Sequence, residues 1–525
     1  MNLFTVNVAM GFVRVYERIY EWLYMPSLKK NVIFNYVGQF YTAFIGILVL
    51  PFYLQELGAE AFGLIGFFTL LLAWLQLLDL GMTPTLGREV ARLKGDVTND
   101  HELRTVVRSL EVVFIGVAII TTIAIFLARG WLSNDWLNIQ NLDVGLVAQC
   151  VGLMAFMVGV RWLSSLYKSG ILAYEQQVWA NIFNIVIVTL RFPAALAVIV
   201  ISKGDILFYF IFQLLLAIVE CLVYSWKLKQ IMPTTDNDVR FSKVSLIRIA
   251  PFALAIGYTA GIWVFVTQLD KLLLSKFLSL TEFGYFTLIA TLSGGIMFLS
   301  GPVGHAVLPR MTNLLAQNKE EEMLMIYLNA TKVVAVIVAP IVLAISFYPK
   351  AVVYIWTGDL EASKWTAQAL PLYVLGYGLL TIGSFQYYLQ YAHGKLRQHV
   401  IYNTISALIS IPLVFYSADT YGAIGVAWVW LVFRVVSLMF WAPYIHHLFA
   451  PGIHLKWLFG SILPAVFACL LVLIPIYVGL DYEFMKDRAT DFFVIALISM
   501  LLLAGSVIAF VPRDLTVFVP GKFCL

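Results

Sequence analysis

Residues 457–479 read WLFGSILPAVFACLLVLIPIYVG, a stretch that contains no Asp, Glu, Lys or Arg. One helix needs about 20 consecutive apolar residues to cross the hydrocarbon core of a bilayer, and this stretch is long enough. A segment of this composition indicates a helix that is surrounded by lipid rather than water. Similar apolar runs recur along the whole chain, so this stretch is representative of the fold.

About fourteen membrane-spanning helices are predicted, which makes the chain an all-α polytopic membrane protein. Of its 525 residues, 61% are hydrophobic and only 12% are charged, and the mean hydropathy is +0.88. An ordinary soluble domain has about twice that share of charge. This composition excludes a soluble enzyme, a disordered protein and a nucleic-acid binder. The apolar runs lie near 31–54, 61–87, 105–128, 143–170, 178–201, 205–227, 246–276, 282–316, 323–349, 366–392, 398–417, 422–446, 457–479 and 490–511.

The positions of Lys and Arg orient these spans, because cytoplasmic loops of membrane proteins carry an excess of both. With a cytoplasmic N-terminus, 23 of the 34 basic residues fall inside, 7 fall outside and four lie within spans. This bias predicts an even number of spans with both termini in the cytoplasm. Within residues 1–28, apolar side chains from Phe12 to Leu23 recur at helical spacing with charged side chains between them, which predicts an amphipathic helix on the cytoplasmic face.

An internal repeat divides the predicted spans into six and eight. Residues 60–63 (EAFG) and 281–284 (TEFG) open the second and eighth spans, and residues 86–88 (LGR) and 308–310 (LPR) close them. Six spans separate the copies, so both halves point the same way across the bilayer, as in a parallel repeat about an axis along the membrane normal. The expected organisation is an N-terminal helix (1–28), an N-terminal lobe (29–228), a cytoplasmic linker (229–245), a C-terminal lobe (246–447) and two further spans with a cytoplasmic tail (448–525).

Ionisable side chains within the spans are the candidate functional residues, since each costs about 2.5–3.5 kcal/mol at the bilayer centre. Each half contributes two such cations, which predicts a cavity that accepts an anion; structural salt bridges, such as Asp79 with Arg88, are the alternative. Glu111 and Glu220 could instead be interfacial, and most histidines are expected at solvated cytoplasmic ends. The set comprises Asp79, Glu111, Arg161, Arg191, Glu220, Asp270, Lys271 and Arg434, with Arg88, His305 and Arg310 near span ends.

Two local features refine this set. Asp270 and Lys271 are adjacent, and neighbours at this spacing do not face each other on a helix, so they are expected to need different partners. Gly301 and Pro302 lie within a predicted span beside the repeat motif, where they are candidates for a hinge. The sequence has no Walker A, GxSxG, HExxH or CxxC motif, so neither an enzyme activity nor a cofactor is predicted.

Three motifs resemble those of a known family. Residues 57–63 (LGAEAFG), with LDLG at 78–81 and REVAR at 88–92, resemble the first two spans of bacterial polysaccharide flippases. Residues 269–274 (LDKLLL), with EFGYF at 282–286, resemble the opening of their second lobe, and YGAIGVA at 421–427 with Arg434 resembles their twelfth span. These are the Wzx-type flippases of O-antigen and other polysaccharides, members of the multidrug/oligosaccharidyl-lipid/polysaccharide (MOP) superfamily. Fourteen spans depart from the twelve of many members and match the related lipid II flippases.

The resemblance implies transport of an undecaprenyl-diphosphate-linked oligosaccharide, an O-antigen or exopolysaccharide unit, from the inner to the outer leaflet of the bacterial cytoplasmic membrane by alternating access. It implies a MATE-like fold, contacts with membrane lipids, polymerase and ligase partners from the same pathway, and no nucleic acid. A cationic cavity would complement the diphosphate. The residues expected to bind it are Arg88, Arg161, Arg191, Lys271, Arg310 and Arg434; Asp79 and Asp270 are expected to be counter-ions or to couple transport to H⁺ or Na⁺.

Three other classes of membrane protein fit the sequence less well. A MATE-like drug or cation antiporter of the same superfamily should have a mainly acidic cavity, whereas the buried set here is mainly cationic. A glycan ligase or polymerase typically carries a large extracytoplasmic loop, and the predicted outside connections are short. A structural membrane subunit would explain neither the repeat nor the buried charges of both halves.

Overall fold

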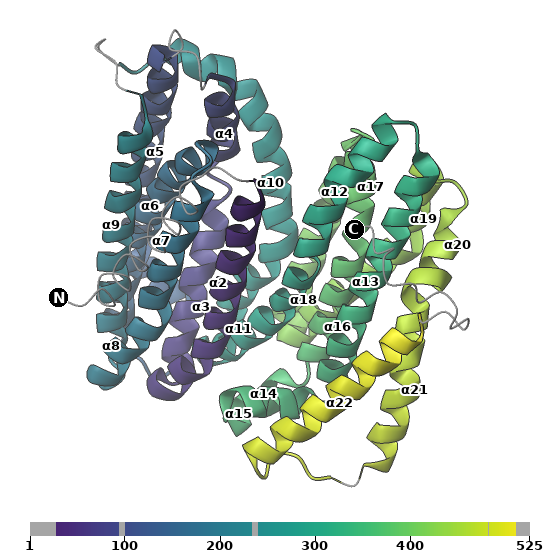
Figure 1. The fold of residues 1–525 in the computed structure, drawn as a ribbon. Coiled ribbons are helices and arrows are strands. Elements are labelled where there is room, and N and C mark those ends of the chain that lie inside the picture. Colours follow the sequence, from purple (N-terminus) through teal and green to yellow (C-terminus); the bar gives the residue numbers. More distant parts are fainter. Residues whose placement is uncertain (1–27, 94–99, 234–239, 481, 511–525) are drawn as a thin grey trace, which may run out of the picture. The chain divides into compact units, whose positions relative to one another are not determined.

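The computed structural model describes residues 28–93, 100–233, 240–480 and 482–510, and every regular element in these ranges is helical (Figure 1). Eleven helices there are long and apolar enough to cross a membrane, or up to twelve with the bent pair Leu360–Thr366 and Leu370–Ala392. The predicted all-α polytopic membrane fold is therefore confirmed. The helix predicted for 1–28 lies outside the described residues, except for Leu28.

The chain forms two compact units. The first contains the described residues up to Leu57, Phe68–Trp136 and Asn141–Val264; the second contains Gly58–Phe67, Leu137–Gln140 and the described residues from Phe265 onward. Helices α3 (Ala59–Leu75) and α10 (Lys243–Phe277) contribute to both. The predicted boundaries of the lobes and the linker stay predictions. The other helices of the first unit are α2 (Leu28–Leu57), α4 (Met82–Leu93), α5 (Asp100–Trp131), α6 (Val144–Ala173), α7 (Gln177–Thr189), α8 (Ala195–Ile201) and α9 (Ile206–Ile231).

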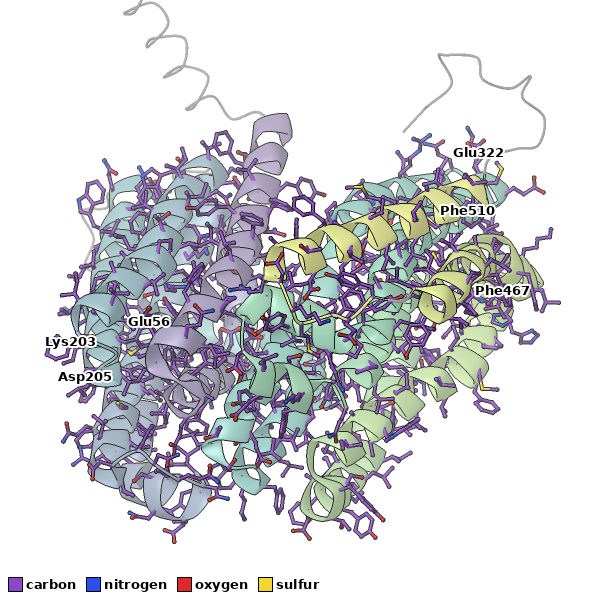
Figure 2. All side chains as sticks on the ribbon, turned by 90° about the horizontal axis from the view of Figure 1, so that it is seen from below. Glu56, Lys203, Asp205, Glu322, Phe467 and Phe510 are labelled. Atoms are coloured by element: carbon purple, nitrogen blue, oxygen red, sulfur yellow. The ribbon has the colours of Figure 1, made fainter. Side chains whose placement is uncertain are left out.

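In the first unit, α6 is the central helix, with half of its apolar stretch buried and α4, α5 and α9 packed against it. The Asp143 carboxylate begins α6 by accepting a hydrogen bond from the backbone N–H of Leu146 at 2.7 Å, which satisfies a free donor of the first turn. The tight turn between α8 and α9 brings Lys203 and Asp205 beside Glu56 at the end of α2 (Figure 2). Gly204 lies in this turn at φ 81°, and a Cβ there would lie 2.7 Å from the Glu56 carbonyl oxygen.

In the second unit, α13 (Glu320–Phe347) is the most buried of the long helices and packs against α12, α16, α21 and α22. Phe510, which is labelled in Figure 2, lies just beyond the end of α22. The ammonium group of Lys332, on α13, lies 5.0 Å from the centroid of its ring. The remaining helices of this unit are α11 (Leu280–Gly295), α12 (Gly301–Ala316), α14 (Pro349–Thr357), α15 (Leu360–Thr366), α16 (Leu370–Gly383), α17 (Phe385–Ala392), α18 (Arg397–Val436), α19 (Ala442–Phe449), α20 (Ile453–Trp457), α21 (Leu463–Gly479) and α22 (Arg488–Ile508).

The repeat motifs pack directly against each other in the second unit. A Cβ on Gly63 would lie 2.2 Å from the Leu280 carbonyl oxygen, and a Cβ on Gly284 would lie 2.2 Å from the Ala59 carbonyl oxygen. Gly284 follows Gly63 by 221 residues and Leu280 follows Ala59 by the same number, so the two contacts are reciprocal. Reciprocal contacts of this kind are those of a local two-fold axis. Glycine is required at both positions because the backbones touch there.

The second span of each half also changes course at an equivalent place. Helix α3 ends at Leu75 and the chain passes through turns before α4 begins at Met82. Helix α11 ends at Gly295 and continues as the 3₁₀ turn η4 (Ile296–Leu299) before α12 begins at Gly301. Leu75 and Ile296 are again 221 residues apart. The repeat is therefore one of three-dimensional structure as well as of short motifs.

The chain doubles back within α18 at Gly422, whose backbone angles are φ 59° and ψ −144°. A Cβ on Gly425 would lie 2.9 Å from the Ser417 carbonyl oxygen, although eight residues of continuous helix would separate these positions by about 12 Å. α18 thus has two antiparallel arms, at the place where the spans 398–417 and 422–446 are predicted to divide. The count of fourteen, which takes both arms, the bent pair and the shorter α3 as spans, stays a prediction.

Candidate functional site

Two of the predicted cations form one polar cluster in the first unit. Nη2 of Arg191 donates to Oε2 of Glu220 at 2.6 Å, and their side chains are only 24% and 10% exposed. Nη2 of Arg161, on α6, donates to Oε1 of Gln213 at 2.8 Å, and this guanidinium also interacts electrostatically with Arg191 and Glu220. The cluster thus holds two guanidinium groups and one carboxylate, which pairs with Arg191, so it has an excess of positive charge. Glu220 is a buried ion-pair partner, and its depth in the membrane stays a prediction.

A local irregularity positions Arg191. Residues Leu190–Ala194 form a π-helical turn that contains Pro193, which has no N–H to donate. Two carbonyl groups of this turn accept from side chains: the Tyr53 hydroxyl donates to Phe192 O at 2.9 Å, and Gln213 Nε2 donates to Arg191 O at 2.7 Å. Gln213 thus binds the backbone of one arginine and the side chain of the other, so it links the two cations.

A small cavity in the second unit is lined by Asp270 and Arg434. It lies between α10 and both arms of α18, and its volume of about 30 Å³ could hold about one water molecule. The Arg434 guanidinium is 4.3 Å from the centroid of the Trp430 ring, and the residue is only 7% exposed. Its Nε is buried without a hydrogen-bond partner in the described residues. An unsatisfied buried donor costs about 1–3 kcal/mol, and more when charged, so this site favours an added acceptor.

Asp270 and Lys271 contact each other, contrary to the expectation that they need different partners. Nζ of Lys271 lies 3.4 Å from Oδ1 of Asp270 and donates to the Thr267 carbonyl oxygen at 2.6 Å. The expectation was wrong because it considered the directions of the Cβ atoms, whereas the flexible lysine side chain turns back along its own helix. Asp270 has a second partner, since the hydroxyl group of Tyr373 donates to Oδ2 at 3.0 Å.

The predicted residues near the helix breaks have other partners. The Asp79 carboxylate accepts from both the backbone N–H and the hydroxyl of Thr83, so it caps the start of α4. Arg88 is exposed, with its guanidinium 4.1 Å from the centroid of the Phe252 ring rather than paired with Asp79. Arg310 is exposed on α12 and does not line the Asp270 cavity.

The predicted hinge residues lie at a change of helix type. Gly301 and Pro302 form the first turn of α12, directly after the 3₁₀ turn η4 and Ser300. Proline suits a first helical turn because its missing N–H has no acceptor there. This position explains the proline without a hinge, and bending at this place stays a prediction.

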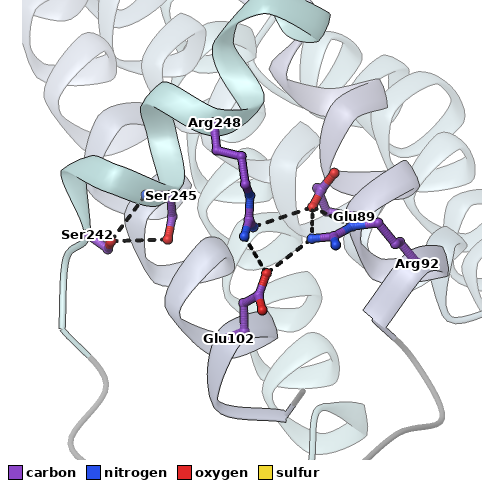
Figure 3. A network of polar contacts seen from close by, with 6 residues as sticks. All are labelled: Glu89, Arg92, Glu102, Ser242, Ser245 and Arg248. Carbon is purple, nitrogen blue, oxygen red and sulfur yellow. Dashed lines mark hydrogen bonds and ion pairs between the residues drawn. The ribbon is translucent and has the colours of Figure 1, made fainter. Parts of the chain in front are cut away.

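One ion network was missed by the sequence reasoning (Figure 3). Glu89 on α4 accepts from Arg92 at 2.7 Å and lies 3.6 Å from Arg248 on α10. Glu102 on α5 accepts from the same two arginines, at 3.1 Å from Arg92 and 2.5 Å from Arg248. The hydrogen bonds with Glu89 and the nearby carboxylates raise the pKa of Arg92 above its ordinary value. The network joins three helices of the first unit, and its members are up to 159 residues apart in sequence.

The expectation of solvated histidines is wrong for His446, which is buried. Its Nε2 lies 2.7 Å from the hydroxyl of Tyr327, and its Nδ1 lies 3.0 Å from Nδ1 of His454. The Trp457 ring packs edge-on against it. Sequence position indicated a span end, but α13 and the α19–α20 turn cover this particular side chain.

Comparison with known proteins decides the family. The family described as polysaccharide biosynthesis protein matches residues 28–315, more than half of the chain. The chain belongs to this family. The matched range includes the Arg161–Arg191 cluster, Asp270 and Lys271, and it ends before Arg434. A Shigella flexneri protein provisionally named an O-antigen transporter is 20% identical over 427 residues, which cover 78% of this chain and 95% of that protein.

Solved structures show that this polysaccharide biosynthesis protein has a MOP-superfamily fold. A structure of the lipid II flippase MurJ, in an inward closed conformation, superposes with a TM-score of 0.66 at 15% identity and covers 91% of this chain and 98% of that chain. An inward-facing multidrug resistance MATE family transporter of the MOP superfamily superposes with a TM-score of 0.62 at 14% identity, covering 77% and 94%. The resemblance inferred from the three motifs is therefore confirmed.

Proposed function

We propose that this protein carries an undecaprenyl-diphosphate-linked oligosaccharide, an O-antigen or exopolysaccharide unit, from the inner to the outer leaflet of the bacterial cytoplasmic membrane by alternating access. The observation that carries the proposal is the excess of buried cations over carboxylates in both units. In the first unit Arg191 pairs with Glu220 and Arg161 bonds only to the uncharged Gln213. In the second unit Lys271 contacts Asp270, and Arg434 lines the same cavity as Asp270 without an ion pair in the described residues. A family of polysaccharide biosynthesis proteins supplies the substrate class, and the flippase fold is that of the superfamily.

The chemistry of the substrate matches these cations. A diphosphate is doubly anionic, and guanidinium groups bind phosphate oxygens through paired, charge-assisted hydrogen bonds. Arg434 is best prepared for this role because its Nε has no acceptor in the described residues. Arg161 is similar, since its Nη2 bonds to an uncharged amide and its Nε also lacks a partner there. Arg88 and Arg310, both exposed, would act at the ends of the path.

The acidic residues have two proposed roles. Asp270 holds the Lys271 ammonium and accepts from Tyr373, so it orients the cation beside Arg434. Asp79 caps α4 at the break of the second span, where binding of H⁺ or Na⁺ would loosen the cap and couple ion movement to bending. Bending at Gly301 and Pro302 is the equivalent movement in the second half.

The setting of the protein is part of the proposal. Both termini lie in the cytoplasm, the polymerase and ligase of the same pathway act next on the product, and lipids surround the apolar faces. A lipid II-type substrate is the second candidate, since the MurJ likeness spans 91% of the chain. A drug or cation antiporter fits less well because its cationic substrate would meet buried arginines.

The test is leaflet translocation by the full chain in proteoliposomes, with a fluorescent undecaprenyl-diphosphate oligosaccharide that an external lectin reports. We expect transport by the wild-type chain and a decrease of at least about tenfold for Arg434→Ala and Lys271→Ala. Lys319→Ala is the control, because that lysine is half exposed and so is its partner Glu322. Unimpaired transport in both site variants refutes the cationic site. Lipid II and a cationic dye, assayed in parallel, separate the competing substrates.

A further inference from the structure

An apolar groove adjoins the cavity of Asp270 and Arg434. It lies between the two arms of α18, beside the reversal at Gly422, and its volume is about 420 Å³. Leu413 and Tyr421 line it from the first arm, and Trp428 and Val432 line it from the second. Except for the polar atoms of Ser417 and Tyr421, its side chains are apolar. The groove is larger and more open than the cavity beside it.

The groove and the cavity have two lining residues in common. Val429 and Phe433 line both, so an apolar site and a cationic site lie side by side in the second unit. On one side of Phe433 in the sequence, Arg434 lines the cavity. On the other side, Val432 lines the groove. A ligand held by both sites must therefore combine an anionic group with an apolar chain attached close to it.

We propose that this groove binds the first isoprene units of the substrate's prenyl chain while the diphosphate lies at Arg434. The inference rests on the proposed function and adds a place for the lipid part of the substrate. A prenyl chain joins its apolar carbons directly to the diphosphate, which matches two sites that share their walls. Isoprene units are flat and methyl-branched, so they suit contact with the rings of Tyr421, Trp428 and Phe433. Such contact would bury a large apolar area of each ring.

The backbone keeps the groove in place. Gly422 adopts a conformation that side chains other than glycine rarely adopt, and it returns the second arm beside the first. Gly425 then allows contact, since a Cβ there would lie 2.6 Å from the Tyr421 Cβ. The groove is thus bounded at one end by touching arms, and a bound chain would run from there toward Val432 and the shared wall.

The experiment uses the full chain in nanodiscs of phosphatidylethanolamine and phosphatidylglycerol. The probe is undecaprenyl diphosphate with a photoreactive diazirine on its first isoprene unit, and labelled peptides are identified by mass spectrometry. Val432→Trp fills the groove, and Val436→Trp is the matched control, since Val436 is a similarly exposed valine one turn away outside the groove (46% against 50%). We expect saturable labelling within 413–433 that falls about tenfold in Val432→Trp and is unchanged in Val436→Trp.

A second filling variant, Leu413→Trp, approaches from the other arm and guards against misfolding of the first. Unlabelled undecaprenyl diphosphate should compete for the label, whereas dioleoyl phosphatidate should not. Equal labelling in the filled and control variants, labelling elsewhere, or equal competition by phosphatidate would overturn the proposal, the last by revealing a general phospholipid site.

The two proposals can fail separately. Translocation that depends on Arg434, together with labelling that ignores Val432→Trp, leaves the flippase proposal intact and removes the groove. Labelling that depends on Val432, without translocation of any lipid-linked oligosaccharide, supports the groove as a prenyl-binding site and refutes the flippase proposal.

Discussion

Substitution of Glu220 tests whether Arg191 stabilises the folded protein through its ion pair or serves mainly to bind a ligand. Glu220 accepts from Arg191 at 2.6 Å, and the two side chains are 10% and 24% exposed. Loss of one partner of a buried ion pair leaves an uncompensated charge and costs about 3–5 kcal/mol. Because about a quarter of Arg191 is exposed, we expect Glu220→Ala to lower the free energy of unfolding by about 3 kcal/mol, the lower end of this range.

The assay is equilibrium unfolding in mixed micelles, with tryptophan fluorescence as the signal, on a double-mutant cycle of Glu220→Ala and Arg191→Met. The double variant should lose much less than the sum of the single variants, since it leaves neither charge unpaired. Glu322→Ala is the control, because Glu322 is 53% exposed and pairs with a half-exposed lysine. Such surface pairs contribute about 0–1 kcal/mol.

Additivity of the two variants within about 0.5 kcal/mol would refute the reasoning, because it would show that the two groups do not stabilise each other. A loss for Glu322→Ala as large as that for Glu220→Ala would refute it as well, since burial would then make no difference. The expected result assigns Arg191 partly to stability, so a transport defect of an Arg191 variant must be corrected for the amount of folded protein.

Three further changes have definite expected outcomes. Gly63→Ala should destabilise the protein by about 1–3 kcal/mol in the same unfolding assay, because the new Cβ meets the Leu280 carbonyl group, whereas Gly116→Ala, with open space around it, should be neutral or slightly stabilising. Gly422→Ala should cost about 1–3 kcal/mol and lower the yield of folded protein in size-exclusion chromatography, because alanine does not favour φ 59°. Arg248→Ala should cost no more than about 1 kcal/mol at low salt and almost nothing at 1 M salt, because Arg248 and its shorter-range partner Glu102 are 44% and 36% exposed and the buried Glu89 keeps its ion pair with Arg92; an effect independent of salt would contradict this.

The membrane fold could be predicted because hydrophobicity is a local property of the chain. Apolar runs such as 457–479 lie on helices whether or not their neighbours are known. The repeat was detectable for a related reason: Gly63 and Gly284 allow backbones to touch, so the surrounding motif is constrained in both copies. The division near Gly422 was also visible, because the sequence separates the apolar runs 398–417 and 422–446 there.

The partners of the buried charges could not be predicted, because they come from distant parts of the chain. Asp270 and its donor Tyr373 are 103 residues apart, and Arg248 and Glu102 are 146 apart. A charged residue within an apolar run is expected to be buried, but the run does not show which residue lies beside it. A salt bridge and a ligand site therefore give the same sequence pattern. The wrong expectation for Asp270 and Lys271 has the same origin, since side-chain flexibility does not appear in helical spacing.

The four cations within the predicted spans divide into two kinds, and both units contain one of each. Arg191 and Lys271 are close to a carboxylate, at 2.6 Å and 3.4 Å. Arg161 and Arg434 form no ion pair within the described residues, and each lies near an aromatic ring, 5.0 Å from the Phe68 centroid and 4.3 Å from the Trp430 centroid. A buried Nε without an acceptor does not separate the two kinds, because Arg191 has one as well. A cation that only stabilises the fold gains most from a buried carboxylate, whereas one that binds a passing anion must leave its donors free. Under the proposed function we therefore expect the cation without an ion pair in each unit, Arg161 or Arg434, to contact the diphosphate in preference to the paired one.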